Sequence, residues 1–478
     1  MKAVFVTAMA MTAVACNKFI DVPIDNRVGI DELGDLEKAI VLLEPGSDHH
    51  FTDLMTDDYT YKLSAGHTVR DIEERLRPIY TFAITKESIS RNQFLSSGMN
   101  PSVAFQRYYF RLNNANLLID RALKLKASKQ ENSELKRLDN VIAHAMTIRA
   151  YCHFMVVNLF AKQYDKNSAS TDLAVPYISE YNANAVVTRP RQTVQYIYDG
   201  VEADLLEALR LIDDGNNYFK NNFYFSKLAI YAFLNRFYLN TKNYSEAIKY
   251  ADLVLEANNN LLNIREIKAD ADNNHEQYSK NYFDPSNKAY LFMGNNTYQL
   301  IAYFWHGLYI DPLVAEMKSN SEAIQTSPLV VDMIPIKLLY FSSTANRNFN
   351  LPLFTVDEVV YNKLEATILR DQAVSEATKA ELNRLVSSHF TTGVAIANRD
   401  IAAQINALST PADAIKLLLR LKRIRFHAEG MRWFDIKRHN LPVTHDYVGT
   451  SFKISGSDPA EYVIKLPLEE INFNNEIN

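Results

Sequence analysis

Apolar residues recur every three or four positions along most of this 478-residue chain. This spacing places them on one face of a helix, so it predicts a mostly helical protein with little β structure. The pattern is clearest over residues 31–43, 105–126, 133–160, 194–212 and 228–255.

Residues 228–255 carry a finer pattern, with two short helices joined by the stretch "NTKNYS". When Leu228 is set as the first position of a tetratricopeptide repeat, the consensus positions are occupied by Tyr231, Leu234, Tyr238, Ala247, Ala251 and Val254. One such helix pair cannot bury its apolar face alone. We therefore expect the segments 105–126, 133–160 and 194–212 to stack on it.

The helical pattern is interrupted over residues 258–304, where Asn, Asp and Tyr predominate. This stretch is predicted to be an irregular surface loop, a type of segment that often carries function. Helical spacing returns over residues 371–409.

A clear helix start follows at Thr410-Pro411, where the threonine can cap the helix and the proline suits its first turn. The apolar positions then form one stripe as far as Phe434, and Leu441-Pro442 should end the helix. The pattern predicts a single helix whose charged residues face away from the core. The expected ion pairs are Arg425–Glu429, Glu429–Arg432 and Arg432–Asp435.

The charges are balanced, with 51 basic and 56 acidic residues and no long run of one sign. This argues against a nucleic-acid partner. The chain has no HExxH, GxSxG or Walker motif. Residues 270–276 alternate like a calcium loop, but His275 replaces its glycine and Asn281 its closing glutamate, so neither a metal nor a cofactor is expected.

The N-terminal stretch "MKAVFVTAMAMTAVAC" has the layout of an export signal: Lys2, an apolar run, and then Cys16. Its apolar run is shorter than the ~20 residues that a membrane span needs. Ala13-Val14-Ala15-Cys16 looks like a lipoprotein box, so residues 1–15 are the expected signal peptide and Cys16 the expected lipid-attachment site. The other cysteine, Cys152, should be free and buried in an apolar helix.

The stretch "RIRFHAEGMRWFDIKRH" resembles the C-terminal signature of the SusD/RagB family, the surface nutrient-binding lipoproteins of Bacteroidetes. The family pattern E-G-x-R-W-F-D-x-x-R matches residues 429–438. Further resemblances follow in the family's order: "YYFRLNNANLLIDRA", "HAMTIRAYCHFMVVNLF", "TRPRQTVQYIYDGVEADLLEAL" and "YVIKLPLEEINFN". One departure is "AKQY" at residues 161–164, where the family often has a Gly-Asp-x-Pro turn.

The residues of this signature are interpreted as structural. Trp433 should pack in the scaffold with its indole N–H hydrogen-bonded. Arg149 should be half-buried and need a carboxylate, for which Asp120 and Asp204 are the candidates. The full structural set is Arg149, Glu429, Arg432, Trp433 and Asp435.

The resemblance implies a SusD-like fold of stacked tetratricopeptide-type helix pairs with irregular, loop-rich insertions. The expected regions are residues 16–220 and 221–478, intertwined in one globular domain. It also implies a lipid-anchored outer-membrane protein, exposed at the cell surface, that performs no chemistry. Such a protein would capture a nutrient oligomer, foremost an oligosaccharide, and pass it to a SusC-like TonB-dependent transporter.

Sugar capture requires flat aromatic faces beside hydrogen-bonding side chains. Two clusters offer them, "YQLIAYFWHGLYIDP" and the stretch from "DDYTYKL" to "RPIYTF". The expected ligand-binding residues are Trp305, Tyr303, Tyr309, Tyr80, Tyr61 and Asp58. Packing of either cluster into the core is an equal alternative.

Three other functions stay open from the sequence. The same aromatics would serve a peptide ligand in a RagB-like importer subunit, and the tetratricopeptide pair alone would suit a protein-interaction scaffold. A glycoside hydrolase using Asp57 and Asp58 ranks last, because adjacent side chains diverge whereas a glycosidase needs two carboxyls flanking one bond.

Overall fold

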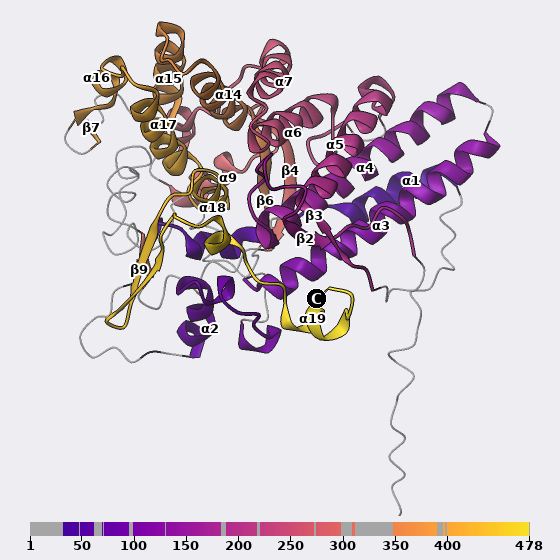
Figure 1. The fold of residues 1–478 in the computed structure, drawn as a ribbon. Coiled ribbons are helices and arrows are strands. Elements are labelled where there is room, and N and C mark those ends of the chain that lie inside the picture. Colours follow the sequence, from indigo (N-terminus) through magenta and orange to yellow (C-terminus); the bar gives the residue numbers. More distant parts are fainter. Residues whose placement is uncertain are drawn as a thin grey trace, which may run out of the picture.

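The computed structural model describes residues 32–46, 48–61, 69, 71–94, 99–129, 131–182, 188–217, 220–271, 274–297, 308–310, 348–389, 395–396 and 399–477. Helices dominate these residues, and the strands form short antiparallel pairs, with β4 (Tyr290–Thr297) and β6 (Asn348–Thr355) among the helices at the centre and β7 (Ala395–Ile396) and β9 (Val443–Tyr447) at one side (Figure 1). The predicted mostly helical fold with little β structure is confirmed.

A stack of consecutive helices forms the centre of the fold, and each helix packs against the next. The first two form a long antiparallel hairpin that extends to one side of the molecule (Figure 1). Together they confirm the four predicted helical segments between residues 105 and 255. Their bounds are α3 (Pro101–Ser128), α4 (Asn132–Phe160), α5 (Val194–Leu211), α6 (Lys227–Asn240) and α7 (Tyr244–Ala257).

The tetratricopeptide pair α6–α7 forms as its pattern predicts. Ser226 caps α6 by accepting a hydrogen bond from the Ala229 N–H, and Asn243 caps α7 in the same way through the Glu246 N–H. The small consensus residues Ala247 and Ala251 are fully buried, which lets the two helices approach closely. Burial of the apolar faces against α5 and α14 (Val356–Asp371) completes the stack.

α14 also belongs to a second, smaller apolar cluster that it forms with α15 (Glu376–His389), α16 (Ile401–Asn406) and α17 (Pro411–Arg425). The main cluster is larger and joins residues from Leu33 to Ile477. The helical pattern predicted over residues 371–409 is confirmed in part by α15 and α16, but the strands β7 (Ala395–Ile396) and β8 (Arg399–Asp400) also lie within this range. The sequence pattern gave no prediction of α14, which begins where Thr355 accepts a hydrogen bond from the Glu358 N–H.

The prediction of an irregular loop over residues 258–304 is wrong in part. This stretch contains α8 (Ile264–Ala271), α9 (His275–Tyr282) and β4 (Tyr290–Thr297). Tyr278 and Tyr282 are fully buried. Tyrosines that count as polar loop formers in the sequence therefore act here as core residues that hold α9 against the scaffold.

The prediction of one helix from Thr410 to the residue before Pro442 is also wrong. Thr410 does cap α17, through the Asp413 N–H, but the helix ends at Arg425, and α18 (Arg432–Arg438) follows a turn. Ala428 and Gly430 have φ values of 58° and 72°, in the left-handed region that breaks a right-handed helix.

The remaining elements are short. The N-terminal helix and the 3-10 turn after it confirm the helix predicted over residues 31–43. The strand pairs are β1–β5, β2–β3, β4–β6, β7–β8 and β9–β10, all antiparallel. The bounds are α1 (Leu33–Ala39), η1 (Ile40–Leu43), η2 (Asp48–Met55), β1 (Tyr59–Tyr61), α2 (Asp71–Tyr80), η3 (Ala83–Thr85), η4 (Arg91–Gln93), β2 (Leu173–Pro176), β3 (Arg191–Thr193), η5 (Asp214–Asn216), β5 (Leu308–Ile310), β6 (Asn348–Thr355), β7 (Ala395–Ile396), β8 (Arg399–Asp400), β9 (Val443–Tyr447), β10 (Thr450–Ile454), η7 (Pro459–Tyr462) and α19 (Leu468–Phe473).

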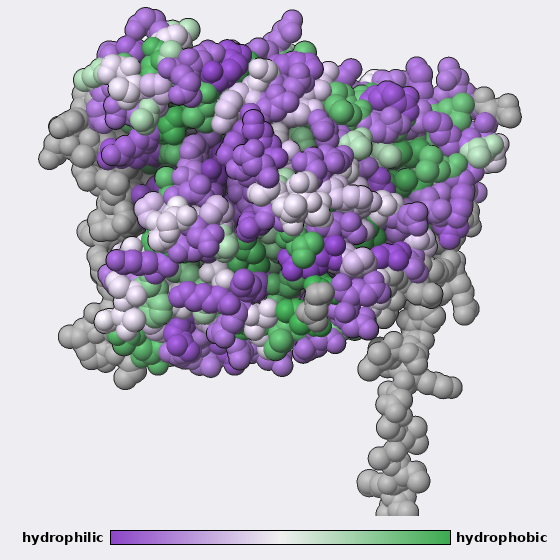
Figure 2. Space-filling model, in the orientation of Figure 1, coloured by the Kyte–Doolittle hydropathy of each residue, from purple (hydrophilic) through white to green (hydrophobic). Residues whose placement is uncertain are grey.

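The visible surface is mostly hydrophilic, with hydrophobic residues in several patches, one of which lies at the lower centre of the face in Figure 2. Across the described residues, every helix is too short or too polar to cross a bilayer. Cys152 is buried and free, as predicted, and burial raises the pKa of its thiol to about 12.

Candidate functional site

The two aromatic clusters that the sequence nominates are joined by a strand pair. β1 pairs antiparallel with β5, so that Thr60 lies opposite Tyr309 and Tyr61 opposite Leu308. Residues 59–61 and 308–310 are thus neighbours in space although about half of the chain separates them. Trp305 and Tyr303 precede β5 and lie outside the described residues, as does Cys16.

On the β1 side the predicted ligand-binding tyrosines are packed. Tyr80 is only 3% exposed, and its ring stacks on His445 with centroids 4.1 Å apart. Tyr61 is 9% exposed, lies 4.7 Å from the ring of Tyr447, and donates a hydrogen bond to Glu73 at 3.0 Å. Their burial matches the packing alternative and argues against direct ligand contact by these two rings.

The adjacent carboxylates after η2 are both engaged with arginines from the C-terminal signature. Asp58 is fully buried and accepts a hydrogen bond from Arg423 Nε at 2.6 Å. Asp57 binds Arg432 through two hydrogen bonds of 2.8 Å. Burial raises the pKa of Asp58, whereas at Asp57 the arginines outweigh burial and lower the pKa.

The prediction that the charged residues of this segment face away from the core is wrong, and these pairs show the reason. Arg423 and Arg432 are 8% exposed, and Arg425 is 2% exposed. Of the predicted ion pairs, Arg425–Glu429 is present, with the two atoms 3.2 Å apart. Arg432 instead reaches Asp57, because the turn after α17 redirects its side chain toward η2.

That turn depends on a glycine. A Cβ atom at Gly430 would lie 2.7 Å from Nε2 of His49, in η2, and the positive φ adds strain for any other residue. His49 in turn contacts the hydroxyl of Tyr108 on α3, at 3.1 Å. The glycine of the signature is therefore required for a close approach between the C-terminal segment and the N-terminal half of the chain.

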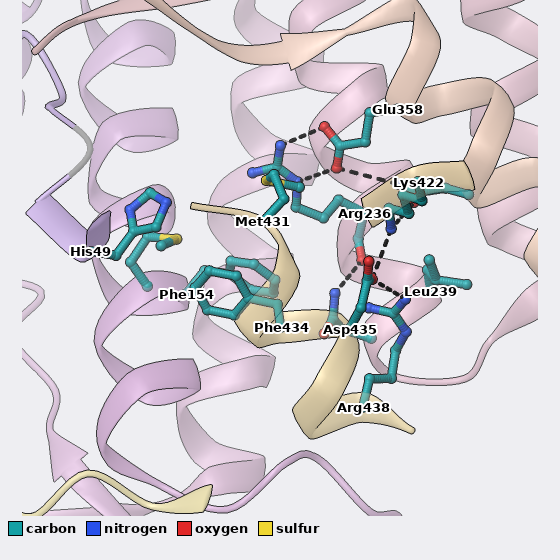
Figure 3. A pocket seen from close by; sticks show the side chains of 13 residues that line it. His49, Phe154, Arg236, Leu239, Glu358, Lys422, Met431, Phe434, Asp435 and Arg438 are labelled. Atoms are coloured by element: carbon teal, nitrogen blue, oxygen red, sulfur yellow. Dashed lines mark hydrogen bonds and ion pairs between the residues drawn. The ribbon is translucent and has the colours of Figure 1, made fainter. Parts of the chain in front are cut away.

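A small cavity lies behind this turn, enclosed by α4, α6, α14 and α18 and by the end of α17 (Figure 3). Its volume is about 30 Å³, which suffices for a water molecule and excludes a sugar ring. Charged side chains project into it: Arg236 binds Glu358 through two hydrogen bonds, and Lys422 and Arg438 both bind Asp435, at 2.9 and 2.7 Å.

The charges around this cavity are mutually compensated. Burial opposes ionisation of Asp435, but Lys422 and Arg438 hold the pKa of that carboxyl below its usual value. The pKa of Glu365 is likewise lowered, against the effect of burial, by Arg438 and His439. The cluster is thus a structural ionic network that ties α6, α14, α17 and α18 together.

Two further residues of the structural set are Arg149, on α4, and Trp433, on α18. Arg149 binds Asp204 through hydrogen bonds of 2.8 and 2.6 Å, which confirms one of its two predicted partners. Asp120, the other candidate, instead pairs with Lys124. Trp433 is fully buried as predicted, but its indole nitrogen has no hydrogen-bond partner among the described residues, so that part of the prediction is wrong.

Several members of the network have no signal in the sequence. Lys422, Glu358 and Glu365 match no motif, and their partners mostly lie far away in the chain. Arg423 and its partner Asp58, likewise, are 365 positions apart in the chain. Only the unusual density of basic residues within an apolar stripe, at 420–425, marks this segment as something other than a solvated helix.

The arrangement does not favour catalysis by Asp57 and Asp58, because both carboxylates already neutralise buried arginines. Within the ranges that the structure describes, no three metal-ligating side chains gather into a potential metal site. What the geometry offers is a charge-compensated group of side chains directly before β1, the strand that pairs with β5.

Part of the chain is similar to a known protein family. Residues 54–239 match a SusD-like family model described as "Starch-binding associating with outer membrane". No curated protein sequence matches the chain.

Solved structures of the SusD superfamily share the fold over most of the chain. A SusD superfamily protein from Bacteroides thetaiotaomicron is 19% identical, with a TM-score of 0.68, over 93% of this chain and 99% of its own. A SusD-like carbohydrate binding protein from Bacteroides vulgatus is 15% identical, with a TM-score of 0.65, over 93% and 97%. Another SusD superfamily protein from Bacteroides vulgatus is 18% identical, with a TM-score of 0.68, over 93% and 98%.

Proposed function

We propose that this chain, whose residues 54–239 match a SusD-like family model, captures a nutrient oligomer at the outer membrane and passes it, chemically unchanged, to a SusC-like TonB-dependent transporter. The first expected ligand is an oligosaccharide. Two findings support this class: the family model is described as starch-binding, and a structural relative is described as carbohydrate binding.

The observation that carries the proposal for this chain is the β1–β5 pair, which joins the two aromatic clusters. We propose that Trp305, Tyr303 and Tyr309 supply the aromatic faces for the sugar rings. Tyr61, Tyr80 and Asp58 would support them from beneath, because all three are buried. A base that is already ordered lowers the entropy lost when a ligand binds.

The central test is Trp305→Ala, with oligosaccharide binding measured by titration calorimetry. We expect binding to fall at least tenfold, which corresponds to about 1.4 kcal/mol, while thermal unfolding stays unchanged. Tyr196→Ala is the matched control, because Tyr196 is an aromatic residue on α5 that is 53% exposed and belongs to neither cluster. Equal affinity of Trp305→Ala and the native protein would remove this residue from the site.

The proposed membrane anchor and partner are tested separately. Cys16→Ala should release the protein from the outer-membrane fraction, and the native protein should co-purify with a TonB-dependent transporter. Binding of oligopeptides but not of oligosaccharides would replace the sugar by a peptide ligand. An absence of any small-oligomer binding and of the transporter would favour a protein-interaction scaffold.

A further inference from the structure

An open groove lies between α3, the segment 176–182 and the C-terminal residues 467–474, and we call it the α3–α19 groove. Its volume is about 620 Å³, within the range of ~300–1,000 Å³ that is usual for ligand sites. None of its lining residues belongs to β1 or β5. It is therefore distinct from the site proposed above.

Two phenylalanines from different elements line this groove. Phe110 on α3 is 57% exposed and Phe473 on α19 is 52% exposed. Single exposed apolar residues are common on protein surfaces, but two large aromatics that line one groove need an explanation. Hydrophobic residues are visible in this lower central region of the molecule in Figure 2, where α3 and α19 lie in Figure 1.

Uncharged hydrogen-bonding groups accompany the rings. Gln106 and Asn113 lie one turn before and one turn after Phe110, on the same face of α3, and Asn182 lines the groove from the segment 176–182. Each amide can both donate and accept a hydrogen bond, as a sugar hydroxyl does. Burial raises the pKa of Glu470, which also lines the groove.

The walls of the groove are held in place by hydrogen bonds that a ligand does not need to form. Asn116 donates to the carbonyls of Ile178 and Glu180, and Arg149 donates to the carbonyl of Ser179. These bonds fix the segment 176–182 against α3 and α4. Arg149 thereby supports the groove as well as its partner Asp204.

The C-terminal wall is fixed in the same way. Glu469 accepts hydrogen bonds of 2.7 Å from the Ser90 hydroxyl and the Arg91 N–H, and Asn474 donates to the Arg189 carbonyl at 2.9 Å. Although burial opposes ionisation, these donors keep the pKa of Glu469 below its usual value. The groove is therefore preorganised, which lowers the entropic cost of binding.

We propose that the α3–α19 groove is a second binding site, which holds a neutral oligosaccharide chain between Phe110 and Phe473. The proposal depends on the proposed function for its ligand class. Acidic residues outnumber basic ones in the lining, so an anionic ligand would be disfavoured. The combination of aromatic faces with amides suits pyranose rings, whose apolar faces stack and whose edges carry hydroxyls.

The test uses the full mature chain and a panel of neutral oligosaccharides of five to seven units, with maltoheptaose as the first probe. Calorimetric titration of the native protein should show two sites, and Phe110→Ala/Phe473→Ala should retain one. Because both rings are exposed, the double variant should unfold at the native temperature. Leu123→Ala is the matched control, since Leu123 is also on α3 and 52% exposed but lies outside the groove.

A milder variant refines the assignment. Asn113→Ala should weaken the second site about fivefold, the effect of one hydrogen bond of about 1 kcal/mol. Trp305→Ala should remove the other site and leave the groove intact.

The outcomes separate the two proposals. If Phe110→Ala/Phe473→Ala still binds at two sites, or if the native protein has a single site that only Trp305→Ala removes, the proposal of a second site in the groove is overturned and the proposed function stands. A native protein that binds no member of the panel overturns both.

Discussion

The helix pair α6–α7 and the segment α17–α18 look alike in sequence, since both carry an apolar stripe with charges between. In the pair α6–α7 the exposed face is solvated: Lys249 on α7 reaches Glu246 at the surface, with both side chains more than a quarter exposed. In α17–α18 the face opposite the stripe is covered by η2, β1 and α14. An apolar stripe therefore shows which side of a helix faces the core, but not whether the other side faces water.

The difference has an energetic consequence. An exposed ion pair contributes little, because water and salt screen it. A buried pair often contributes no more in net terms, because both ions lose their hydration, but removal of one partner leaves a buried charge without compensation. The two regions should thus respond very differently to the loss of a single charge.

The largest expected effect is that of Arg425→Ala. Arg425 has no exposed side-chain surface and contacts both Asp357 and Glu429, at 3.1 and 3.2 Å. Its removal leaves two buried carboxylates without this cation, and we expect a loss of about 3–5 kcal/mol in the free energy of unfolding. Urea denaturation followed by circular dichroism measures this loss.

The matched control for this variant is Arg210→Ala on α5, whose pair with Glu207 lies at the surface. We expect no measurable change in its stability. If the two variants were equally stable, the buried network would not distinguish α17–α18 from the helical stack.

The second effect concerns the turn that separates α17 from α18. Gly430→Ala should destabilise the protein by about 2 kcal/mol, because it combines a positive φ with a clash against His49. Gly34→Ala should act in the opposite direction, with a gain of about 0.5 kcal/mol, because Gly34 lies in α1 with open space around it. Thermal unfolding of both variants provides the comparison. If Gly430→Ala unfolded at the native temperature, the close approach of residue 430 to His49 would not be needed for stability.

The same contrast explains what could be predicted from the sequence. The helices α3 to α7 follow from periodicity and caps, because each packs on its neighbour in the chain and the signals are local. The Thr410 cap is equally local and was predicted correctly. Arg149 was assigned a carboxylate partner because a charged residue within an apolar helix needs one, and Asp204 provides it.

The errors arise where contacts are distant in the chain. Nothing near Arg423 indicates that Asp58 covers it, and nothing near Gly430 indicates that His49 lies against it. The prediction of a loop at α9 is wrong for a related reason. The sequence does not distinguish a buried tyrosine from a tyrosine in a surface loop, because the difference lies in its neighbours in space. The α3–α19 groove was missed because its walls come from three separated segments with no shared motif.

The last effect, and the one that sharpens the comparison most, is the pH dependence that Lys437 confers. This lysine is fully buried on α18, and its Nζ donates hydrogen bonds to the carbonyls of Asn158 and Ala161 at the end of α4. Burial lowers its pKa to about 7, whereas an unfolded lysine titrates near pH 10.4. Between these values the unfolded chain binds the extra proton, so stability should rise as the pH increases from about 7 toward 10.

The free energy of unfolding should rise because of this residue by about 1 kcal/mol per pH unit. The slope is smaller to the extent that the two carbonyls stabilise the charged form of Lys437. Lys437→Met removes the titrating group and keeps most of the volume, so the free energy of unfolding of the native protein minus that of the variant should increase from pH 7 to 9.5. A flat difference would mean that the carbonyls of α4 hold Lys437 in its charged state. In that case α18 would resemble the surface helices in its response to pH, although not in its burial, and the two regions would differ only in the pairing of their arginines.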